Sequence, residues 1–228
     1  MAIKVYGFKF SSFCRSVLMT AKHLNIKVEL VVTDPGQNQQ FTSEFLALNP
    51  AHSLPTIDDN GFILWESRAI MAYLCNEYGG ADCPLYPRDP QKRALIDRWL
   101  NFDATLMESS KAGFKQKLYT GVDPPADKVL AFKGHLKLMD QLIANNRYLT
   151  GANHVTIADL SLVSNLGNLV NADKDRTGID MAEYPNIGRW YSGLTQELPY
   201  FQEINAIPQE ERKTWVANSM GYLSKRCK

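Results

Sequence analysis

The sequence predicts an α/β domain followed by an all-α domain, and three observations lead to this prediction. Short apolar strand patterns alternate with helical patterns over about the first 80 residues. Two glycines and two prolines then occur within residues 79–87, which is typical of a linker. Beyond them the apolar residues recur only at helical spacing. We therefore expect one domain over residues 1–80, a linker over residues 81–89 and an all-helical domain over residues 90–228.

The first half of the α/β domain has a strand, a helix and a second strand. Residues 3–8 and 28–32 are short apolar runs, and the second is rich in β-branched side chains. Between them, apolar residues follow the spacing of one helix face: Cys14, Val17, Leu18, Ala21 and Leu24. After a polar loop, residues 41–48 predict a short helix or an irregular turn.

The second half of this domain has two strands and a helix. Asn60-Gly61 is a strong hairpin signal, and it lies between apolar runs at residues 56–58 and 62–65. Residues 67–78 then follow a helical pattern. The complete order is βαβ followed by ββα over about 80 residues, which is the plan of a thioredoxin-like domain.

The pattern beyond the linker predicts a helical bundle. Two sets of apolar residues step by four, three and four positions: Leu95, Trp99, Phe102 and Leu106, and Phe132, Leu136, Met139 and Ile143. Thr156 and Asp159 have the spacing of a capping box at the start of another helix. Residues 184–197 and 209–222 predict two further helices.

The composition argues against several classes of function. The chain has 228 residues, of which 45% are hydrophobic and 21% charged, and its formal net charge is +1. That charge gives no electrostatic case for binding nucleic acid or an anionic membrane. No apolar stretch approaches the roughly 18 residues that a membrane helix needs. The expected partners are therefore small molecules.

The cysteines and the first residues predict a cytoplasmic protein without a metal. The four cysteines, Cys14, Cys75, Cys83 and Cys227, form neither a CxxC pair nor a metal-ligand spacing. They are typical of reduced thiols in the cytosol, with Cys75 expected in the core. The first residues have a strand pattern rather than the long apolar core of a secretory signal.

A helix start at residues 10–17 is the first candidate site. Ser11, Ser12 and Cys14 lie where backbone N–H groups and the positive end of the helix dipole favour an anion. A serine hydroxyl without a neighbouring base is a poor nucleophile, but it can donate to a sulfur. It would then favour the thiolate of a bound thiol over the free thiol, whose pKa is about 8.5. The alternative is that both serines only cap the helix.

Two further motifs suggest sites for other parts of the same ligand. Pro55 begins a strand, and a cis bond before it would let the backbone of Leu54 pair with a peptide-like ligand. Glu66 and Ser67 begin a helix, where Ser67 suits a carboxylate and Glu66 an ammonium group. The alternatives are an ordinary proline at a hairpin edge and an ordinary capped helix. One ligand with a thiol, a peptide bond and an amino-acid end satisfies all three motifs, and glutathione has these groups.

Four segments together resemble the cytosolic glutathione S-transferase family over nearly the whole chain. They are SSFCRSV at residues 11–17, NPAHSLPTI at 49–57, DNGFILWESRAI at 59–70 and TIADL at 156–160. The resemblance is strongest to the insect delta/epsilon enzymes, which use a serine. It implies a glutathione-binding first domain, a homodimer and a role in detoxification.

The resemblance implies a role for each matching residue. Ser11 matches the serine that stabilises the thiolate. The implied glutathione contacts are Gln40, His52, Ser53, Leu54, Pro55, Glu66, Ser67, Arg68 and Asp103. Within that set, Glu66, Ser67 and Arg68 match the γ-glutamyl site, and Asp103 matches a residue that supports Arg68, either in its own chain or across a dimer.

Three residues depart from the family pattern. Phe13 replaces a common proline, Gln40 replaces a frequent histidine, and Leu54 replaces the commoner valine or isoleucine. Ser12 in place of Ser11 as the acting hydroxyl also stays open.

The expected reaction is attack of the glutathione thiolate on an electrophilic carbon in an apolar pocket between the domains. The residues expected to line this pocket are Phe10, Phe13, Met107, Ser110, Lys111, Phe114, Leu118 and Trp215. The same helix face carries Glu108, Lys111 and Lys115, so acceptors with a polar or anionic part are expected unless these charges face solvent.

Other functions on the same fold are weighed against this one. Cys14 as the working group would give a thiol transferase, but its place on the apolar helix face predicts that it is buried. The isomerase branch of the family also has adjacent serines, and Phe13-Cys14 departs from its motif. A carrier that binds hydrophobic ligands without turnover is the third alternative, because fold alone does not decide function.

Overall fold

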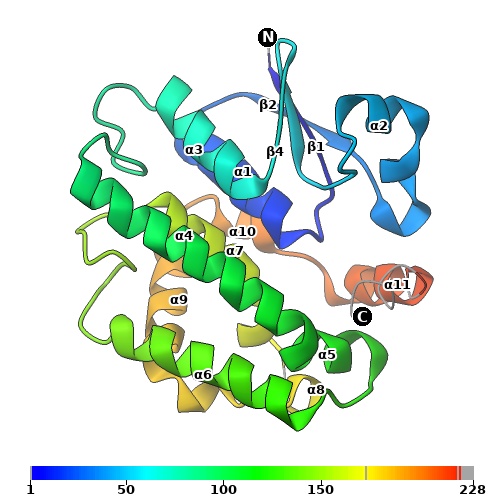
Figure 1. Ribbon diagram of the computed structural model, residues 1–228, viewed down its shortest axis with the longest axis vertical. Helices are drawn as coiled ribbons and strands as arrows, with labels where there is room; N and C mark the ends of the chain where they lie inside the picture. The colour runs from blue at the N-terminus through cyan, green and yellow to red at the C-terminus, as the bar shows by residue number, and fades with distance from the viewer. Residues whose placement is uncertain (1, 173, 220, 222–228) are drawn as a thin grey trace.

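The computed structural model describes residues 2–172, 174–219 and 221. Cys227 and the end of the predicted 209–222 helix lie outside the described residues. Figure 1 shows a sheet domain in the upper part of the molecule and a helical domain below it. Within the described part of the chain, no helix is long and apolar enough to cross a membrane.

The first domain is a four-stranded sheet with helices, as the sequence predicts. The strands are β1 (Ile3–Gly7), β2 (Val28–Val32), β3 (Thr56–Asp59) and β4 (Phe62–Trp65), in the order β2-β1-β3-β4. β1 is parallel to β2, whereas β3 is antiparallel to both β1 and β4. The mixed sheet confirms the thioredoxin-like plan.

The helices of this domain begin close to where the sequence predicts. They are α1 (Ser12–His23), α2 (Ser43–Leu48) and α3 (Ser67–Tyr78), with short 3-10 turns η1 (Pro35–Gln37) and η2 (Gln39–Phe41) before α2. Asn60 and Gly61 both have positive φ, of 53° and 94°, between β3 and β4. Two such residues in a two-residue loop match the twist of the flanking strands, so the hairpin prediction is confirmed.

The second domain is helical among its described residues. Its longer helices are α4 (Pro90–Ser110), α6 (Ala126–Leu142), α7 (Ile157–Val170), α9 (Pro185–Glu197) and α11 (Gln209–Asn218). Shorter elements are η3 (Lys111–Lys115), α5 (Gln116–Thr120), α8 (Lys174–Thr177), η4 (Met181–Glu183) and α10 (Phe201–Asn205). The element η3 is a π-helical turn that joins α4 to α5.

The buried helix α7 organises the second domain. The predicted capping box at its start is confirmed, because Asp159 accepts from the backbone N–H and the hydroxyl of Thr156. The same carboxylate accepts from Leu149 N at 2.9 Å and from Trp190 Nε1 at 3.0 Å. Helix α7 also contacts α1, which contacts α3 on another side. The helix that begins at Ser12 is therefore held between the two domains.

Candidate functional site

Ser11 is the N-cap of α1 and faces a cavity. Its Oγ accepts from the backbone N–H of Cys14 at 3.3 Å, and its backbone is extended, as expected for a cap. Ser12 is the first residue of the helix and is 9% exposed. A hydroxyl has two acceptor positions and one donor proton, so this capping bond does not use the proton of Ser11, which either the Cys14 sulfur or a ligand sulfur can accept.

Cys14 lies in the core and not at the cavity. Its side chain has no exposed surface, and its Sγ accepts from Phe8 N at 3.4 Å. Burial raises the pKa of this thiol, although the hydrogen bonds from Ser11 and Phe8 act in the opposite sense. A thiol that is buried and kept protonated is a poor nucleophile. The prediction that Cys14 is buried is confirmed.

A cavity of about 370 Å³ opens at Ser11. This first cavity is lined by Phe8, Phe10, Ser11, Ser12, Phe13 and Pro35, by Arg68, and by Ala104, Met107, Glu108, Lys111, Lys115, Tyr119, Asn168 and Trp215. Five residues expected in the acceptor pocket are therefore brought together around the hydroxyl: Phe10, Phe13, Met107, Lys111 and Trp215.

Three other residues expected in this pocket lie elsewhere. Ser110 is fully buried, and its hydroxyl donates to the carbonyl of Met107 at 2.7 Å. Phe114 is 1% exposed and packs on Phe132, with ring centroids 5.2 Å apart. Leu118 lines a neighbouring second cavity of about 580 Å³, which is bounded by α1, α5 and α7 to α11.

The π-helical turn η3 explains the differences at Phe114 and Leu118, whereas Ser110 lies before this turn, as the last residue of α4, and is buried there. The expectation assumed an uninterrupted α-helix, in which positions 107, 110, 111, 114 and 118 share one face. In η3, Gln116 N–H donates to the carbonyl of Lys111, five residues earlier. This wider turn rotates the chain by a smaller angle per residue. Lys115 and Tyr119 therefore follow Met107 and Lys111 on the cavity side.

The predicted ligand loop is held by Asn49, which sequence reasoning missed. The Leu54–Pro55 peptide bond is cis. Buried Asn49 donates from Nδ2 to Ser53 O and Oγ, both at 3.1 Å, and to Thr56 Oγ1 at 2.9 Å. Among the described residues, no hydrogen bond uses the backbone of Leu54. The loop therefore presents an N–H and a C=O that a peptide could pair with.

Two other residues implied by the resemblance lie beside this loop. His52 has a positive φ of 45°, and its exposed ring packs on Phe41 with centroids 4.8 Å apart. Gln40 is 3% exposed, and its Oε1 has no hydrogen-bond partner among the described residues. A buried amide oxygen without a partner is rare in proteins, so it is a candidate acceptor for a ligand N–H.

The start of α3 carries the third predicted motif. Glu66 is exposed with a φ of 70°, a conformation that costs a non-glycine residue free energy and that often marks ligand sites. Ser67 is buried as the first helical residue. Arg68 donates from Nε and Nη2 to Asp103 Oδ2 at 2.9 and 2.6 Å, and it lines the first cavity.

Asp103 joins three helices around Arg68. It has no exposed surface, and besides Arg68 of α3 it accepts from Ser161 Oγ at 2.7 Å and Asn165 Nδ2 at 3.0 Å, both of α7. The carboxylate is therefore satisfied by donors of its own chain. The polar positions of α7, a helix that is otherwise apolar, were the signal for this network and for Asn168 at the cavity.

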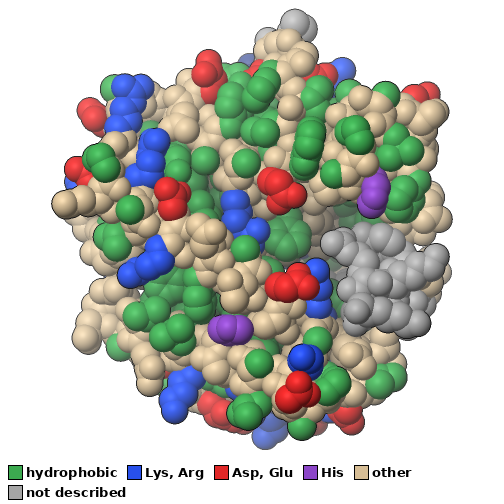
Figure 2. Space-filling view, in the orientation of Figure 1, with side chains coloured by type: hydrophobic (Ala, Val, Ile, Leu, Met, Phe, Trp, Pro, Cys, Tyr) green, Lys and Arg blue, Asp and Glu red, His purple; other side chains and the backbone are tan. Residues whose placement is uncertain are grey.

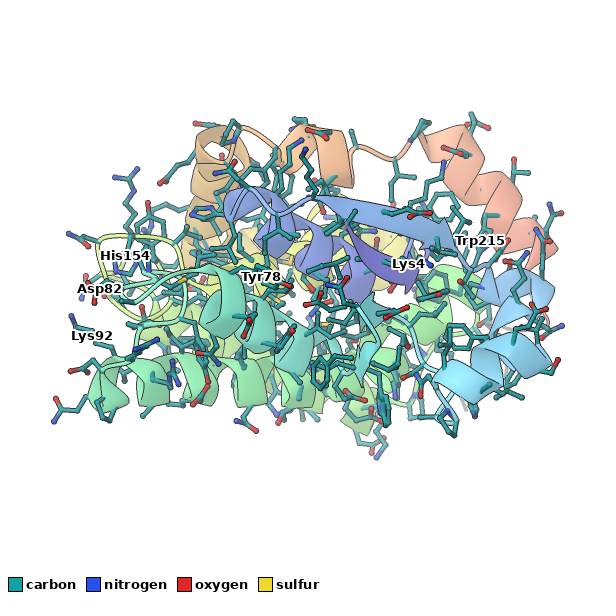
Figure 3. The ribbon with its side chains drawn as sticks, turned by 90° about the horizontal axis from the view of Figure 1, so that it is seen from above. Lys4, Tyr78, Asp82, Lys92, His154 and Trp215 are labelled. Carbon is teal, nitrogen blue, oxygen red and sulfur yellow. The ribbon has the colours of Figure 1, made fainter. Side chains whose placement is uncertain are left out.

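Trp215 brings the C-terminal helix to the first domain. Its ring lies 4.9 Å from that of Phe8 and 5.4 Å from that of Phe10, and its Nε1 donates to Asp34 Oδ1 at 3.0 Å. An ion pair joins Lys9 to Glu211 beside it. In Figure 3, Trp215 lies between α11 and the strands of the first domain. Helix α11 therefore closes one side of the first cavity.

The described residues contain no group of three or more His, Cys, Asp or Glu that could hold a metal ion. The groups that line the first cavity include hydroxyls and cations, and they lie near the backbone N–H groups of a helix N-terminus. This arrangement favours an anionic sulfur next to an apolar surface.

Comparison with known proteins agrees with this geometry. Residues 5–82 match the family model of the glutathione S-transferase N-terminal domain, and residues 126–192 match that of the C-terminal domain. Glutathione S-transferase D7 of Drosophila melanogaster is 30% identical over 212 residues, which are 92% of each chain. A delta-class glutathione transferase of Nilaparvata lugens is 35% identical with a TM-score of 0.81, over 96% of this chain and 99% of that one. An epsilon-class enzyme of the housefly, Musca domestica, is 30% identical with a TM-score of 0.80, over 98% of both chains. The chain is an enzyme of the glutathione S-transferase family.

Proposed function

We propose that this enzyme conjugates glutathione to electrophilic compounds, with the hydroxyl of Ser11 stabilising the glutathione thiolate. The thiolate attacks an electrophilic carbon held in the first cavity beside Phe13. A sulfur–carbon bond forms, and the electron pair leaves with a displaced group or moves to a neighbouring acceptor atom. The observation that carries this proposal is the position of Ser11, an N-cap hydroxyl that opens onto the cavity.

The electrostatics of the α1 N-terminus support this role. The oxygen of Ser11 accepts from Cys14 N, so its proton can point to the sulfur of a ligand. The positive end of the helix dipole and the donated hydrogen bond both favour the thiolate. Together they lower the pKa of the bound thiol below the ordinary value of about 8.5.

The remaining contacts orient the tripeptide. The backbone of Leu54 pairs with the cysteinyl part, and the unpartnered oxygen of Gln40 accepts from an N–H of the ligand. The γ-glutamyl end lies at the start of α3, where Glu66 takes the ammonium group and Ser67 the carboxylate. Asp103 fixes Arg68 beside this end through two hydrogen bonds.

We further propose that two copies associate through the face that carries β4. Figure 2 shows hydrophobic side chains gathered over this strand. Phe62 and Trp65 of β4 are 48% and 37% exposed, and Leu95 of α4 is 40% exposed. Such a group of exposed apolar side chains is typical of an interaction surface. Sedimentation of the protein would show a dimer, and Phe62→Lys would shift it towards the monomer.

The kinetic test compares Ser11→Ala with Ser12→Ala, using a chloronitrobenzene as acceptor. We expect Ser11→Ala to lower kcat by about 10²- to 10³-fold, which is the effect of removing one donor to a developing anion. The Kd for glutathione should change little, because the other contacts remain. Ser12→Ala should retain most of the activity. An unchanged kcat in Ser11→Ala would assign the role to Ser12 or to another group.

A further inference from the structure

We propose that the preferred acceptors carry an anionic group at the end of an apolar chain, and that the second cavity binds this end. The inference rests on the proposed function, because it places the electrophilic carbon of the same molecule at Ser11.

The two cavities adjoin one another. Phe10, Tyr119, Asn168 and Trp215 line both of them. The second cavity is the larger, at about 580 Å³ against about 370 Å³. A ligand that passes between these shared residues would hold one end beside Ser11 and place the other in the second cavity.

The second cavity has a one-sided charge. Its lining includes Arg15, Arg176 and Lys213, and no acidic side chain of the described residues lines it. The first cavity is lined by Arg68, Lys111 and Lys115 but also by Glu108, and two of its cations are paired, Lys111 with Glu108 and Arg68 with Asp103. An anionic group in the second cavity therefore meets no acidic side chain of the described lining, whereas in the first cavity it meets the carboxylate of Glu108.

The three cations differ in their surroundings. Arg15 is 3% exposed and donates to neutral oxygens, namely Asn205 Oδ1 and Lys9 O at 3.0 Å and Ser164 O at 3.4 Å. Lys213 pairs with Glu210 at 2.7 Å. Arg176 of α8 is exposed, and no acidic side chain among the described residues lies within ion-pair distance of it. Arg176 is therefore the cation that can most readily take a new anionic partner.

The remaining walls suit a chain with an apolar body. Leu118, Phe201, Ile207 and Val216 contribute apolar surface. The amide of Gln202 lies among the lining residues and can donate to an anion, whereas that of Asn171 already donates to Gly167 O and Tyr191 OH. This combination fits an amphiphile, such as an unsaturated aldehyde whose other end is a carboxylate.

Glutathione can be conjugated to such a molecule by addition, without a leaving group. The thiolate adds to the β-carbon of the unsaturated aldehyde, and a sulfur–carbon bond forms. The electron pair of the carbon–carbon double bond moves to give an enolate, and the α-carbon then takes a proton from solvent. The carboxylate takes no part in these bonds, so it affects the binding and position of the acceptor rather than its reactivity.

The test uses matched acceptors that end in a carboxylate, a methyl ester or an alcohol, at several chain lengths. At the best length we expect kcat/KM for the carboxylate to exceed that for the ester by about tenfold, which is the effect of one charge-assisted hydrogen bond. Arg176→Gln should reduce this ratio at least threefold, about the worth of a partly exposed ion pair. Lys174→Gln, on the same helix but outside the lining of the second cavity, should leave the ratio unchanged.

A binding measurement separates this inference from the proposed function. A saturated carboxylate of the same length cannot be conjugated, so calorimetry reports its binding alone. We expect it to bind more tightly than its methyl ester, and Arg176→Gln to weaken it. Equal binding of acid and ester, or identical behaviour of Arg176→Gln and Lys174→Gln, would overturn the inference. Absence of turnover with chloronitrobenzene in the unmodified enzyme would instead contradict the proposed function.

Discussion

The two sides of the first cavity are built in different ways around Ser11. On the first-domain side, the proposed glutathione contacts come from short segments whose structure is local: the cap at Ser11, the cis loop at Pro55 and the start of α3. On the other side, the wall comes from the continuous stretch of α4, η3 and α5, from α7 and from α11, three parts of the chain that are far apart in the sequence. A local motif fixes its own geometry, whereas the helical wall depends on register and docking across the whole domain.

The comparison predicts that changes on the first-domain side affect glutathione, whereas changes on the helical side affect the acceptor. Asp103 belongs to both sides, because it receives donors from α3 and α7. A change at Asp103 should therefore not be confined to one side, and it should lower both the stability of the protein and its affinity for glutathione.

The largest expected effect is that of Asp103→Ala. It removes a fully buried carboxylate and leaves Arg68, Ser161 and Asn165 without their acceptor. Breaking a buried ion pair by removing one partner costs about 3–5 kcal/mol. Urea unfolding should show a loss of this size in the free energy of unfolding, with weaker glutathione binding. Glu108→Gln breaks the exposed pair with Lys111 and should cost less than about 1 kcal/mol.

Gly113→Ala tests the helical side through the π turn. A Cβ at this position would lie 2.5 Å from the Cβ of Phe132, so the turn must shift. We expect a loss of about 1–3 kcal/mol in the free energy of unfolding, as for other overpacked sites. The KM for acceptors should rise while the Kd for glutathione stays the same.

Gly134→Ala is the matched control for this substitution. A Cβ there meets no atom within 4 Å, and the position is inside α6. The change should stabilise the protein by about 0.5–1 kcal/mol, because alanine is the better helix former. Equal destabilisation by the two substitutions would mean that the fit of the π turn against α6 is unimportant.

Trp215→Ala tests the contribution of α11. Its ring packs on Phe8 and Phe10, and such aromatic contacts are worth about 0.5–1.5 kcal/mol each beyond their buried area. We expect the KM for acceptors to rise several-fold, with glutathione affinity unchanged. Trp215→Phe keeps the ring contacts but loses the hydrogen bond to Asp34. Its KM for acceptors should lie between that of the unmodified enzyme and that of Trp215→Ala. Weaker glutathione binding in Trp215→Ala would contradict the claim that the helical side affects only the acceptor.

The smallest expected effect is a pH dependence at the contact between the domains. His23 of α1 lies 2.6 Å from Tyr200 OH, and burial lowers the pKa of His23 from its ordinary value of 6.5. The unfolded chain therefore takes up the proton at higher pH than the folded protein does. Stability is lost as the pH falls through about 6.5 towards the folded-state pKa.

The measurement for His23 is the urea midpoint above and below that range. In the unmodified protein the midpoint should decrease at the lower pH, and in His23→Gln the decrease should be smaller. An identical decrease in the two proteins would assign the pH dependence to other groups.

Much of the first domain could be predicted from the sequence because its signals are local. The Asn60-Gly61 turn needs positive φ at both residues, and the apolar periodicity of 67–78 gives the span of α3. The capping box of Thr156 and Asp159 is also a local pattern, and it fixed the start of α7. In each case a few neighbouring residues determine the backbone.

The helical wall could not be predicted to the same extent. The expectation for Phe114 and Leu118 extends an α-helical period through a π turn, which the spacing of the apolar residues does not mark. Gly113 was the available signal, since its close approach to Phe132 leaves no space for a side chain. Asn168 reaches the cavity only through the packing of α7 against α1. The spacing of residues in the sequence does not predict this tertiary packing.

The central claim is that the hydroxyl of Ser11 stabilises the thiolate of bound glutathione. The most direct measurement is the pKa of that bound thiol, followed by the ultraviolet absorbance of the thiolate in the unmodified enzyme, Ser11→Ala and Ser12→Ala. We predict a pKa well below about 8.5 in the unmodified enzyme and in Ser12→Ala, and a return towards that value in Ser11→Ala. A Ser11→Ala enzyme that binds glutathione with the unmodified pKa would contradict the claim.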